Sequence, residues 1–245
     1  MGNGFYLITG TSRGIGAALA HKLLEEGNTV LGISRKPSVS FNSTKYHHLA
    51  FDLAETSQLD QIMDKVNQIV DDQNFDFVCL VNNASAYKPL GSIENCSASE
   101  IDSHVKIGLI APMILISMFV HRFKDEEMRK KVVFISSGAA FTALPDQSIY
   151  CSSKAGLKMF AECVGLEQKN EAYGFEINSI GPGMVDTAMQ QKIRSKSSDE
   201  FAMAGFFQQA FEDGKLQDPA EVAEGIYTLL ASKNEQGKYV SVNGG

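Results

Sequence analysis

Short apolar runs alternate with longer amphipathic segments along the whole chain. Several of the runs are almost wholly apolar, which is typical of parallel strands covered by helices on both faces. The alternation therefore predicts an α/β fold, a single doubly wound parallel sheet of about seven strands with helices on both faces. The expected strands are Phe5–Thr9, Thr29–Ser34, Tyr46–Phe51, Phe77–Asn82, Lys131–Ser137, Phe175–Ile180 and Lys238–Val242.

Capping residues mark the ends of several predicted helices. Gly27 predicts a left-handed cap at the end of the first helix. Ser97 followed by Glu100 predicts a capping box at the start of another helix. Asp218 followed by Pro219 predicts the start of the last helix, because aspartate caps well and proline fits the first helical position.

One polar, weakly patterned stretch interrupts the alternation at residues 188–217. It follows a predicted strand end, where α/β folds bind ligands, and we interpret it as a lid over a substrate pocket. A pair of surface helices without such a role is the alternative. No linker-like segment divides the chain, so residues 1–245 are expected to form a single domain.

Composition narrows the class of protein. The net charge of −7 over 245 residues argues against nucleic acid or an anionic membrane as the main partner. The four cysteines include no C-x-x-C pair and no signal peptide precedes Phe5, which favours a reducing, cytoplasmic location. The adjacent His47 and His48 lack spaced partner ligands, so no metal site is expected. The apolar run 107–120 is interrupted by Pro112 and too short to span a bilayer, and it predicts a buried helix.

A glycine-rich turn follows the first predicted strand and opens a helix. Its glycines allow the backbone to turn tightly and to approach a pyrophosphate, which then lies at the positive helix N-terminus. Such a turn alone is a weak signal, but the strand–turn–helix context is the one that a Rossmann-type dinucleotide-binding fold requires. The candidate cofactor-binding residues in the turn are Gly10, Ser12, Arg13, Gly14, Ile15 and Gly16.

The end of the second strand bears on the choice of cofactor. An acidic residue there would bind the ribose 2′-hydroxyl of NAD, but this chain has Ser34-Arg35-Lys36. Arg13 adds a second guanidinium, and guanidinium groups bind a phosphate dianion through charge-assisted hydrogen bonds. The two arginines and Ser34 therefore predict NADP(H) as the cofactor. Ordinary solvated loop charges are the alternative for Arg35 and Lys36.

Tyr150 and Lys154 are the candidate catalytic pair. Their i, i+4 spacing places both side chains on one face of a predicted helix, downstream of a strand that ends at Ser137. The Lys154 ammonium and an oxidised nicotinamide are expected to lower the pKa of Tyr150, which would then act as a general acid–base group. The Ser137 hydroxyl is suited to stabilise charge on a reacting carbonyl oxygen. A tyrosine and lysine at this spacing occur often by chance, so the pair gains weight only from its neighbours.

The order of these motifs resembles the short-chain dehydrogenase/reductase family over essentially the whole chain. The resemblance implies that Ser137, Tyr150 and Lys154 are catalytic and that Lys154 also binds the nicotinamide ribose. Residues 82–85 match the family's N-N-A-G motif with Ser85 where glycine is usual, and residues 242–245 read V-N-G-G against V-D-G-G. The cofactor-binding residues that the family implies outside the glycine turn are Asp52, Leu53, Asn83, Ala84, Tyr150, Lys154, Pro182, Gly183, Val185 and Thr187.

One position departs from the family pattern. The helix after the capping box usually carries a catalytic asparagine that helps to hold a water chain, and alignment places Gly108 there. Glycine supplies no amide side chain and loosens a helix by about 1 kcal/mol. The departure predicts a proton relay that is weaker, or that is completed by an additional water.

Residues 111–115, 136–140 and 185–194 resemble the bacterial benzil reductase branch of the family, which is itself similar to sepiapterin reductases. That resemblance implies NADPH-dependent reduction of one carbonyl of a vicinal diketone such as benzil. We expect broad specificity for small carbonyl compounds, because methionine adapts to several ligand shapes. The candidate pocket residues are Phe141, Leu144, Met184, Met189 and Phe206. For the two phenylalanines of the lid, Phe206 and Phe207, core or oligomer contacts are the alternative.

Two other functions remain open at this point. A 3-oxoacyl carrier-protein reductase would use basic residues near the pocket for an acidic carrier, and Lys192, Arg194 and Lys196 provide some. A non-catalytic NADP(H)-sensing protein could share the fold, although the presence of Tyr150 and Lys154 weighs against it. The family also implies a homodimer or homotetramer, formed through the predicted helices around residues 107 and 150.

Overall fold

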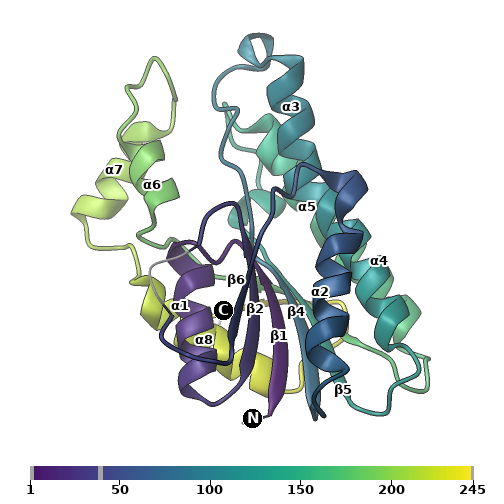
Figure 1. Ribbon diagram of the computed structural model, residues 1–245. Coiled ribbons are helices and arrows are strands. Elements are labelled where there is room, and N and C mark those ends of the chain that lie inside the picture. The colour runs from purple at the N-terminus through teal and green to yellow at the C-terminus, as the bar shows by residue number, and fades with distance from the viewer. Residues whose placement is uncertain (1–2, 38–40, 244–245) are drawn as a thin grey trace.

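The computed structural model describes residues 3–37 and 41–243. Their seven strands form one sheet (Figure 1). Its strand order is β3-β2-β1-β4-β5-β6-β7, and every neighbouring pair is parallel. The order reverses between β1 and β4, and such a reversal creates a ligand-binding crevice at the carboxyl ends of the strands. The strands are β1 (Gly4–Thr9), β2 (Thr29–Ser34), β3 (Tyr46–Ala50), β4 (Phe77–Asn82), β5 (Arg129–Ile135), β6 (Glu176–Gly181) and β7 (Tyr239–Ser241).

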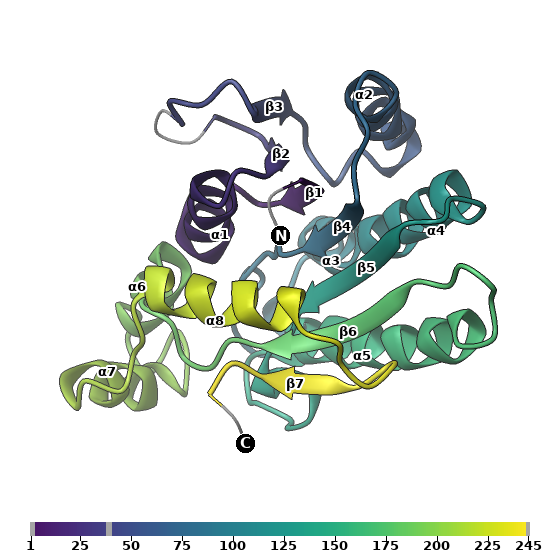
Figure 2. The ribbon, with the colours of Figure 1, turned by 90° about the horizontal axis from the view of Figure 1, so that it is seen from below.

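Helices cover both faces of the sheet. Figure 2 shows α1 and α8 on one face and α2, α4 and α5 on the other, while α3, α6 and α7 lie beyond the carboxyl edge in Figure 1. The helices are α1 (Gly14–Glu25), α2 (Asp60–Val70), α3 (Ala98–Val105), α4 (Ala111–Phe123), α5 (Ser148–Gln168), α6 (Ala188–Arg194), α7 (Ala204–Glu212) and α8 (Pro219–Ala231). Short 3₁₀ turns occur at Thr56–Gln58, Ile93–Asn95 and Gly138–Ala140.

Alternation along the strands divides the interior into two cores. Leu7 and Leu80 belong to the core beneath α2, α4 and α5. Ile8 and Val81, one residue further along, belong to the core beneath α1 and α8. Successive strand residues point to opposite faces, so a strand buried on both sides is apolar throughout. This explains why the continuous apolar runs predicted the strands, and the doubly wound α/β fold is confirmed.

The predicted strands agree with the observed ones except near their ends. The largest difference is at β5, which is two residues earlier than expected and ends at Ile135 rather than Ser137. Ser137 leaves the sheet because its hydroxyl oxygen accepts a hydrogen bond from the Ala139 N–H and begins a 3₁₀ turn. Gly244 and Gly245, the end of the family-like closing motif, lie outside the described residues.

The predicted helix caps are present. Gly27 has a φ of +80°, and its N–H donates to the Leu24 carbonyl oxygen. Ser97 and Glu100 form the reciprocal capping box at the start of α3. The Asp218 carboxylate accepts a hydrogen bond from the Ala220 N–H and caps α8.

Pro112 does not end the helix that contains the apolar run, and this helix is longer than the run itself. The helix runs without a break over Ala98–Phe123, because a π-helical segment at Lys106–Ile110 precedes Pro112 and absorbs the missing backbone N–H. By length and composition this helix could cross a membrane: it has 26 residues, and its most apolar window has a mean hydropathy of 1.8. The face of α4 that packs on the sheet is buried, as expected, but only 33% of that window is buried in all. One such helix is weak evidence for a membrane span, because core helices of soluble proteins can be equally long and apolar.

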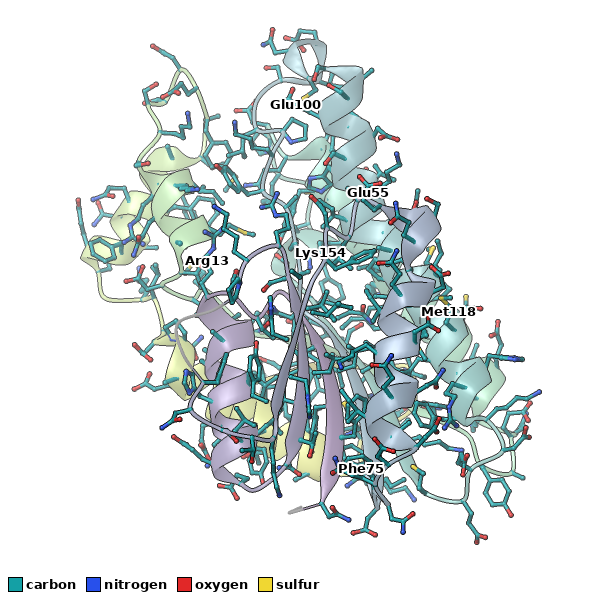
Figure 3. The ribbon with its side chains drawn as sticks, in the orientation of Figure 1. Arg13, Glu55, Phe75, Glu100, Met118 and Lys154 are labelled. Atoms are coloured by element: carbon teal, nitrogen blue, oxygen red, sulfur yellow. The ribbon has the colours of Figure 1, made fainter. Side chains whose placement is uncertain are left out.

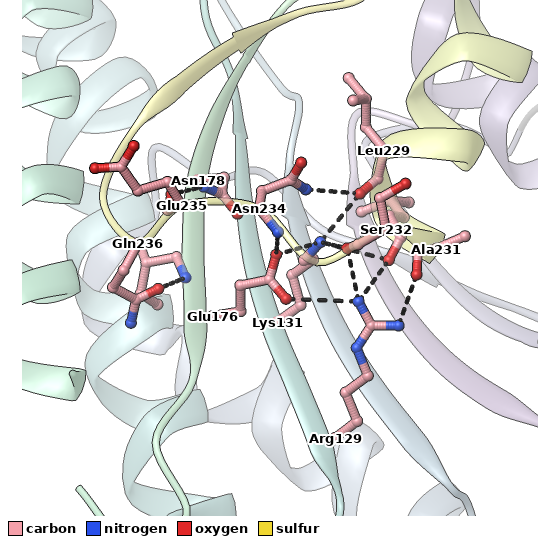
Figure 4. A network of polar contacts seen from close by, with 12 residues as sticks. Arg129, Lys131, Glu176, Asn178, Leu229, Ala231, Ser232, Asn234, Glu235 and Gln236 are labelled. Atoms are coloured by element: carbon pink, nitrogen blue, oxygen red, sulfur yellow. Dashed lines mark hydrogen bonds and ion pairs between the residues drawn. The ribbon is translucent and has the colours of Figure 1, made fainter. Parts of the chain in front are cut away.

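Three consecutive cations at the start of β5 anchor helix ends on both sides of the sheet: Arg129, Lys130 and Lys131. The Arg129 guanidinium donates to the Ala231 carbonyl oxygen at the end of α8. The buried Lys131 ammonium donates to the Leu229 and Ser232 carbonyl oxygens at the end of α8 and forms a 2.7 Å ion pair with Glu176 (Figure 4). The buried Lys130 ammonium instead donates to the Phe123 carbonyl oxygen at the end of α4. Cations stabilise helix C-termini through the helix dipole, so this triplet joins both helical layers to the sheet.

Candidate active site

The glycine turn has the geometry of a phosphate cradle. Gly10 and Gly14 have φ values of +80° and +58°, which L side chains rarely adopt. A Cβ added to Gly10 would lie 2.9 Å from the Ala84 Cα, so the two loops approach as closely as backbones allow. Arg13 precedes α1 and makes no side-chain cap, which leaves the first N–H groups of α1 available to a pyrophosphate.

The N-N-A motif braces the glycine turn. The N–H groups of Asn83 and Ala84 both donate to the Thr9 hydroxyl oxygen at 3.0 Å. The Asn83 amide nitrogen donates to the carbonyl oxygens of Thr9 and Gly10 at 2.9 Å and 3.2 Å. The loops after β1 and β4 are thereby fixed to each other on both sides of the crevice. The side chain of Asn83 acts on the loop itself, and its predicted cofactor contact would have to come from its backbone.

The residues predicted to bind a 2′-phosphate lie around the end of β2. Arg13 and Arg35 are exposed, and the Arg35 guanidinium lies 4.0 Å from the Asp52 carboxylate. The Ser34 hydroxyl donates to the Lys36 carbonyl oxygen at 2.7 Å and contacts the His48 Nε2 at 2.9 Å. The two guanidinium groups are thus free to turn towards a phosphate, whereas the Ser34 hydroxyl is already engaged.

The loop after β3 holds the predicted adenine-contacting pair. The Asp52 carboxylate accepts a hydrogen bond from the Ala54 N–H at 3.0 Å, which fixes the turn. Leu53 is 8% exposed and belongs to the core beneath α2 and α4. This packing anchors the loop to the core, while the Asp52 side chain remains 41% exposed.

Tyr150 and Lys154 occupy one face of α5, as their spacing predicts. The Lys154 ammonium lies 5.7 Å from the centre of the Tyr150 ring and donates to the Ile135 carbonyl oxygen at 2.8 Å. Burial lowers the pKa of Lys154 to about 8. Figure 3 shows Lys154 and Arg13 at the same end of the sheet, so the candidate catalytic pair and the glycine turn lie at the same end of the strands.

The pKa of Tyr150 differs from the expectation. Burial raises the pKa of Tyr150, and hydrogen bonds with the side chains of Ser137 and Ser85 only partly oppose that effect. The side chains of the protein therefore do not by themselves lower the pKa of Tyr150, which the sequence had led us to expect. A raised pKa keeps the phenol protonated at neutral pH, which is the state that a proton donor requires. The Ser137 oxygen accepts the Ala139 N–H at 3.2 Å, so its O–H remains available as a donor.

The predicted nicotinamide-binding segment closes the other side of the crevice. Thr187 lies beside the glycine turn, where a Cβ added to Gly14 would be 3.2 Å from the Thr187 Cγ2. The Thr187 oxygen accepts the Gln190 N–H and caps α6, which leaves its O–H free to donate. Val185 forms an isolated parallel bridge with Gln217, whose amide nitrogen donates to the Pro182 carbonyl oxygen. Gly183 has a φ of +76°, which the turn after β6 requires.

The segment of residues 188–217 folds into α6 and α7 and is tied to the rest of the site. The Ala202 N–H donates to the Asp146 carboxylate at 2.8 Å, immediately before α5. The Lys192 ammonium lies over the Tyr87 ring at 5.6 Å. Arg194 pairs with Asp186 at 2.8 Å. These contacts link the segment to the loops after β4, β5 and β6.

The predicted pocket residues are not all brought together. Leu144, Met184 and Met189 are half-buried, and Phe206 is 57% exposed on α7. Phe141 is 52% exposed and packs on Tyr239 of β7 with Lys158 nearby, whereas Phe206 packs on Phe207.

Gly108 lies in the π-helical segment next to α5. A Cβ there would be 3.4 Å from the Ser153 Cβ and 3.6 Å from the His104 ring. The buried Ser153 hydroxyl and the buried Asn82 amide have no hydrogen-bond partner among the described residues. The sequence singled out Gly108 but gave no sign of these polar neighbours. Ser85 was visible as a departure from the N-N-A-G motif, although its effect on the pKa of Tyr150 was not.

The fold and site define a short-chain dehydrogenase. Residues 5–198 match the family described as short chain dehydrogenase, and the chain belongs to that family. It is 35% identical to a benzil reductase ((S)-benzoin forming) of Bacillus cereus, over 98% of this chain and 99% of that protein. It is also 35% identical to the Bacillus subtilis benzil reductase, with 97% of both chains covered, and 26% identical to a sepiapterin reductase of Meriones unguiculatus, covering 91% and 90%. A short-chain dehydrogenase/reductase structure from Saccharomyces cerevisiae has the same fold, with a TM-score of 0.82 at 24% identity over 98% of this chain and 96% of that one.

Proposed function

We propose that this oxidoreductase is an NADPH-dependent reductase of ketones that acts on one carbonyl of a vicinal diketone such as benzil. The observation that carries the proposal is the assembly of Ser137, Tyr150 and Lys154 beside the glycine turn. The 35% identity to two Bacillus benzil reductases over nearly the whole chain supports the substrate class.

Each catalytic residue has a distinct task in this reaction. A bound nicotinamide dinucleotide supplies the hydride that adds to the carbonyl carbon. The Ser137 O–H donates to the carbonyl oxygen and stabilises its developing charge. The Tyr150 O–H transfers its proton to that oxygen, and Lys154 holds the nearby positive charge that stabilises the resulting tyrosinate. Water at the site then returns a proton to Tyr150.

NADPH as the specific cofactor follows from the charges around the end of β2. Arg13 and Arg35 are exposed cations in the loops after β1 and β2, and no acidic residue ends β2. Guanidinium groups bind a 2′-phosphate through paired charge-assisted hydrogen bonds. The nearby Asp52 carboxylate, 4.0 Å from Arg35, is the one group that weakens this preference among the described contacts of Arg35.

An acidic carrier protein is a poorer fit than a small molecule. Two of the cations that were candidates for carrier binding are neutralised within the segment itself: Arg194 pairs with Asp186, and Lys196 pairs with Glu200. Lys192 lies over the Tyr87 ring. A protein that only senses NADP(H) would not need Ser137, Tyr150 and Lys154 together, so their arrangement favours an enzyme.

We further propose that residues 188–217 form a lid and that the protein is a cytoplasmic homo-oligomer with no membrane or nucleic-acid partner. The open face of the apolar helix and of α5 supports an oligomer, because Ile110, Met159 and Leu166 are 37%, 56% and 70% exposed. Analytical ultracentrifugation of the wild type and of Leu166→Glu tests this. A dimer or tetramer that dissociates in the variant is expected, and a monomeric wild type would contradict it.

The function is tested by following NADPH and NADH consumption with benzil, 1-phenyl-1,2-propanedione, sepiapterin and an acetoacetyl thioester. We expect turnover of the two diketones with NADPH and much slower turnover with NADH. Turnover of the thioester alone would favour the carrier-protein reductase. Tight NADPH binding without turnover of any of the four would favour the sensing protein.

A further inference from the structure

We propose that His48 favours NADPH over NADH by holding the turn that carries Arg35, acting through the hydroxyl group of Ser34. The inference rests on the proposed NADPH-dependent function and deepens it, because it identifies a further residue on which the cofactor preference depends. The observation that carries it is a hydrogen bond between the edge strand β3 and the end of β2.

The Ser34 side chain closes the turn at the end of β2. Its O–H donates to the Lys36 carbonyl oxygen at 2.7 Å, two residues further along the chain. Arg35 lies between these two residues, so the turn fixes the backbone from which its exposed guanidinium extends. The Ser34 carbonyl oxygen also accepts the Phe51 N–H at 3.2 Å. The buried Ser34 hydroxyl therefore controls the short stretch of chain that presents Arg35.

His48 holds this hydroxyl group from the neighbouring strand. Its Nε2 lies 2.9 Å from the Ser34 Oγ. The single hydroxyl hydrogen of Ser34 is already donated to Lys36, so its oxygen accepts and the His48 Nε2–H donates. Burial lowers the pKa of His48, which leaves the ring neutral at neutral pH with this one N–H. Ser34 is thus held on both sides, as a donor within its own turn and as an acceptor from β3.

The same face of β3 also holds the glycine turn. Tyr46 and His48 are two residues apart on the strand, so their side chains point to the same side of the sheet. The Tyr46 hydroxyl lies 3.2 Å from the Thr11 hydroxyl in the glycine turn. It reaches Thr11 across β2 at Gly32, where an added Cβ would clash with both hydroxyl oxygens. The edge strand thus holds both loops that carry the candidate phosphate-binding arginines, Tyr46 through the glycine turn and His48 through the end of β2.

These two contacts have different consequences for the choice of cofactor. The glycine turn approaches the pyrophosphate, which NADH and NADPH share, so losing the Tyr46 contact should weaken the binding of both. The turn at residues 34–36 presents a cation that binds only a 2′-phosphate. Without the His48 contact, Arg35 loses more conformational entropy on binding, and the Asp52 carboxylate, 4.0 Å away, competes for it. His48 is therefore a positioning residue that determines specificity for the 2′-phosphate.

The test compares 2′,5′-ADP with 5′-AMP, two fragments of the cofactors that differ only in the 2′-phosphate. Their dissociation constants are measured by isothermal titration calorimetry for the wild type, His48→Leu and His48→Gln. We expect His48→Leu to weaken the binding of 2′,5′-ADP by about 3- to 10-fold and to leave that of 5′-AMP nearly unchanged. His48→Gln keeps an N–H donor about as far from the backbone as the His48 Nε2, so its binding should stay close to the wild type.

Two neighbouring residues of β3 provide matched controls. His47→Leu makes the same change one residue earlier, but His47 lines a surface hollow with Asp64 and Lys65 of α2, so both fragments should bind as in the wild type. Tyr46→Phe removes the hydroxyl that contacts the glycine turn and should weaken the two fragments by the same factor. The ratio of the KM values for NADPH and NADH should follow the ratio for the two fragments in every variant.

The outcomes separate the inference from the proposed function. If His48→Leu weakens both fragments equally, or neither, while the wild type prefers 2′,5′-ADP, the role of His48 is overturned and the NADPH-dependent function stands. A wild type that binds 2′,5′-ADP no more tightly than 5′-AMP would overturn the NADPH preference, and the inference with it. A loss confined to 2′,5′-ADP in His48→Leu and absent from His48→Gln is the expected result, and a misfolded variant would lose both fragments.

Discussion

The Lys154 ammonium donates a 2.8 Å hydrogen bond to the carbonyl oxygen of Ile135, the last residue of β5. This bond joins the helix that carries Tyr150 to the strand end that leads to Ser137. It is also the one hydrogen bond of the ammonium to the described residues. A buried cation with so few partners is poorly compensated, and burial lowers its pKa to about 8.

The first prediction concerns the pH dependence of the reduction. Lys154 is charged below about pH 8 and becomes neutral above it, so the charge that stabilises the tyrosinate is lost as the pH rises. We expect kcat/KM for NADPH, which reports the free enzyme, to fall on the alkaline side with an apparent pKa near 8. Lys154→Arg keeps its charge at this pH and should lack that transition, even if its rate is lower. A wild-type profile that stays flat to pH 10 would contradict the assignment.

The second prediction concerns Arg13 and Arg35. Replacing both with alanine removes the charge-assisted hydrogen bonds to a 2′-phosphate and should raise KM for NADPH by about 100-fold. KM for NADH serves as the internal control and should change little, because NADH has no 2′-phosphate. Steady-state kinetics with both cofactors measures the ratio. A parallel rise for NADH and NADPH would mean that the arginines support the loop and do not select the phosphate.

The third prediction concerns the attachment of the proposed lid. Asp146 is a non-glycine residue with a φ of +60°, and its carboxylate accepts the Ala202 N–H at 2.8 Å. Asp146→Gly tolerates that backbone conformation but removes the bond, so KM for the diketone should rise about 3- to 10-fold. Asp146→Asn tolerates the same backbone and keeps an oxygen acceptor, so it should stay near the wild type. If the two variants behave alike, the bond does not hold the lid.

The fourth prediction concerns the contribution of Lys131, near the start of β5, to stability. Lys131→Met removes a buried cation from the end of α8 and from Glu176, and should lower the free energy of unfolding by about 3 kcal/mol. The matched control is Lys215→Met, because the Lys215–Asp213 pair is exposed and such pairs contribute about 1 kcal/mol or less. Urea denaturation at an unchanged m-value measures both. Equal midpoints for the two variants would show that the buried network contributes no more than a surface pair.

The sequence predicted the features that depend on local pattern. Continuous apolar runs located the strands because both faces of the sheet are covered. The spacing of Gly10 and Gly14 located the glycine turn, and the spacing of Tyr150 and Lys154 located the candidate catalytic pair. The length of the helix around Pro112 was not expected, because the π-helical turn before Pro112 lets the helix continue.

The remaining features depend on contacts between distant segments. The Asp146–Ala202 bond joins residues 56 positions apart, and no motif indicates it. The raised pKa of Tyr150 follows from its burial, which the sequence does not specify. Ser85 is an intermediate case: it was visible as a change from the family motif, but no motif indicates that it lowers the pKa of Tyr150.

The central claim is that Tyr150 is the proton donor of an NADPH-dependent ketone reductase. The most direct measurement is the turnover of benzil by Tyr150→Phe at saturating NADPH, together with the NADPH dissociation constant from cofactor fluorescence. The account predicts a loss in kcat of about 100- to 10,000-fold, because the ring remains and only the acid–base group is removed, with NADPH affinity close to that of the wild type. A variant that binds NADPH normally and still reduces benzil at the wild-type rate would contradict it.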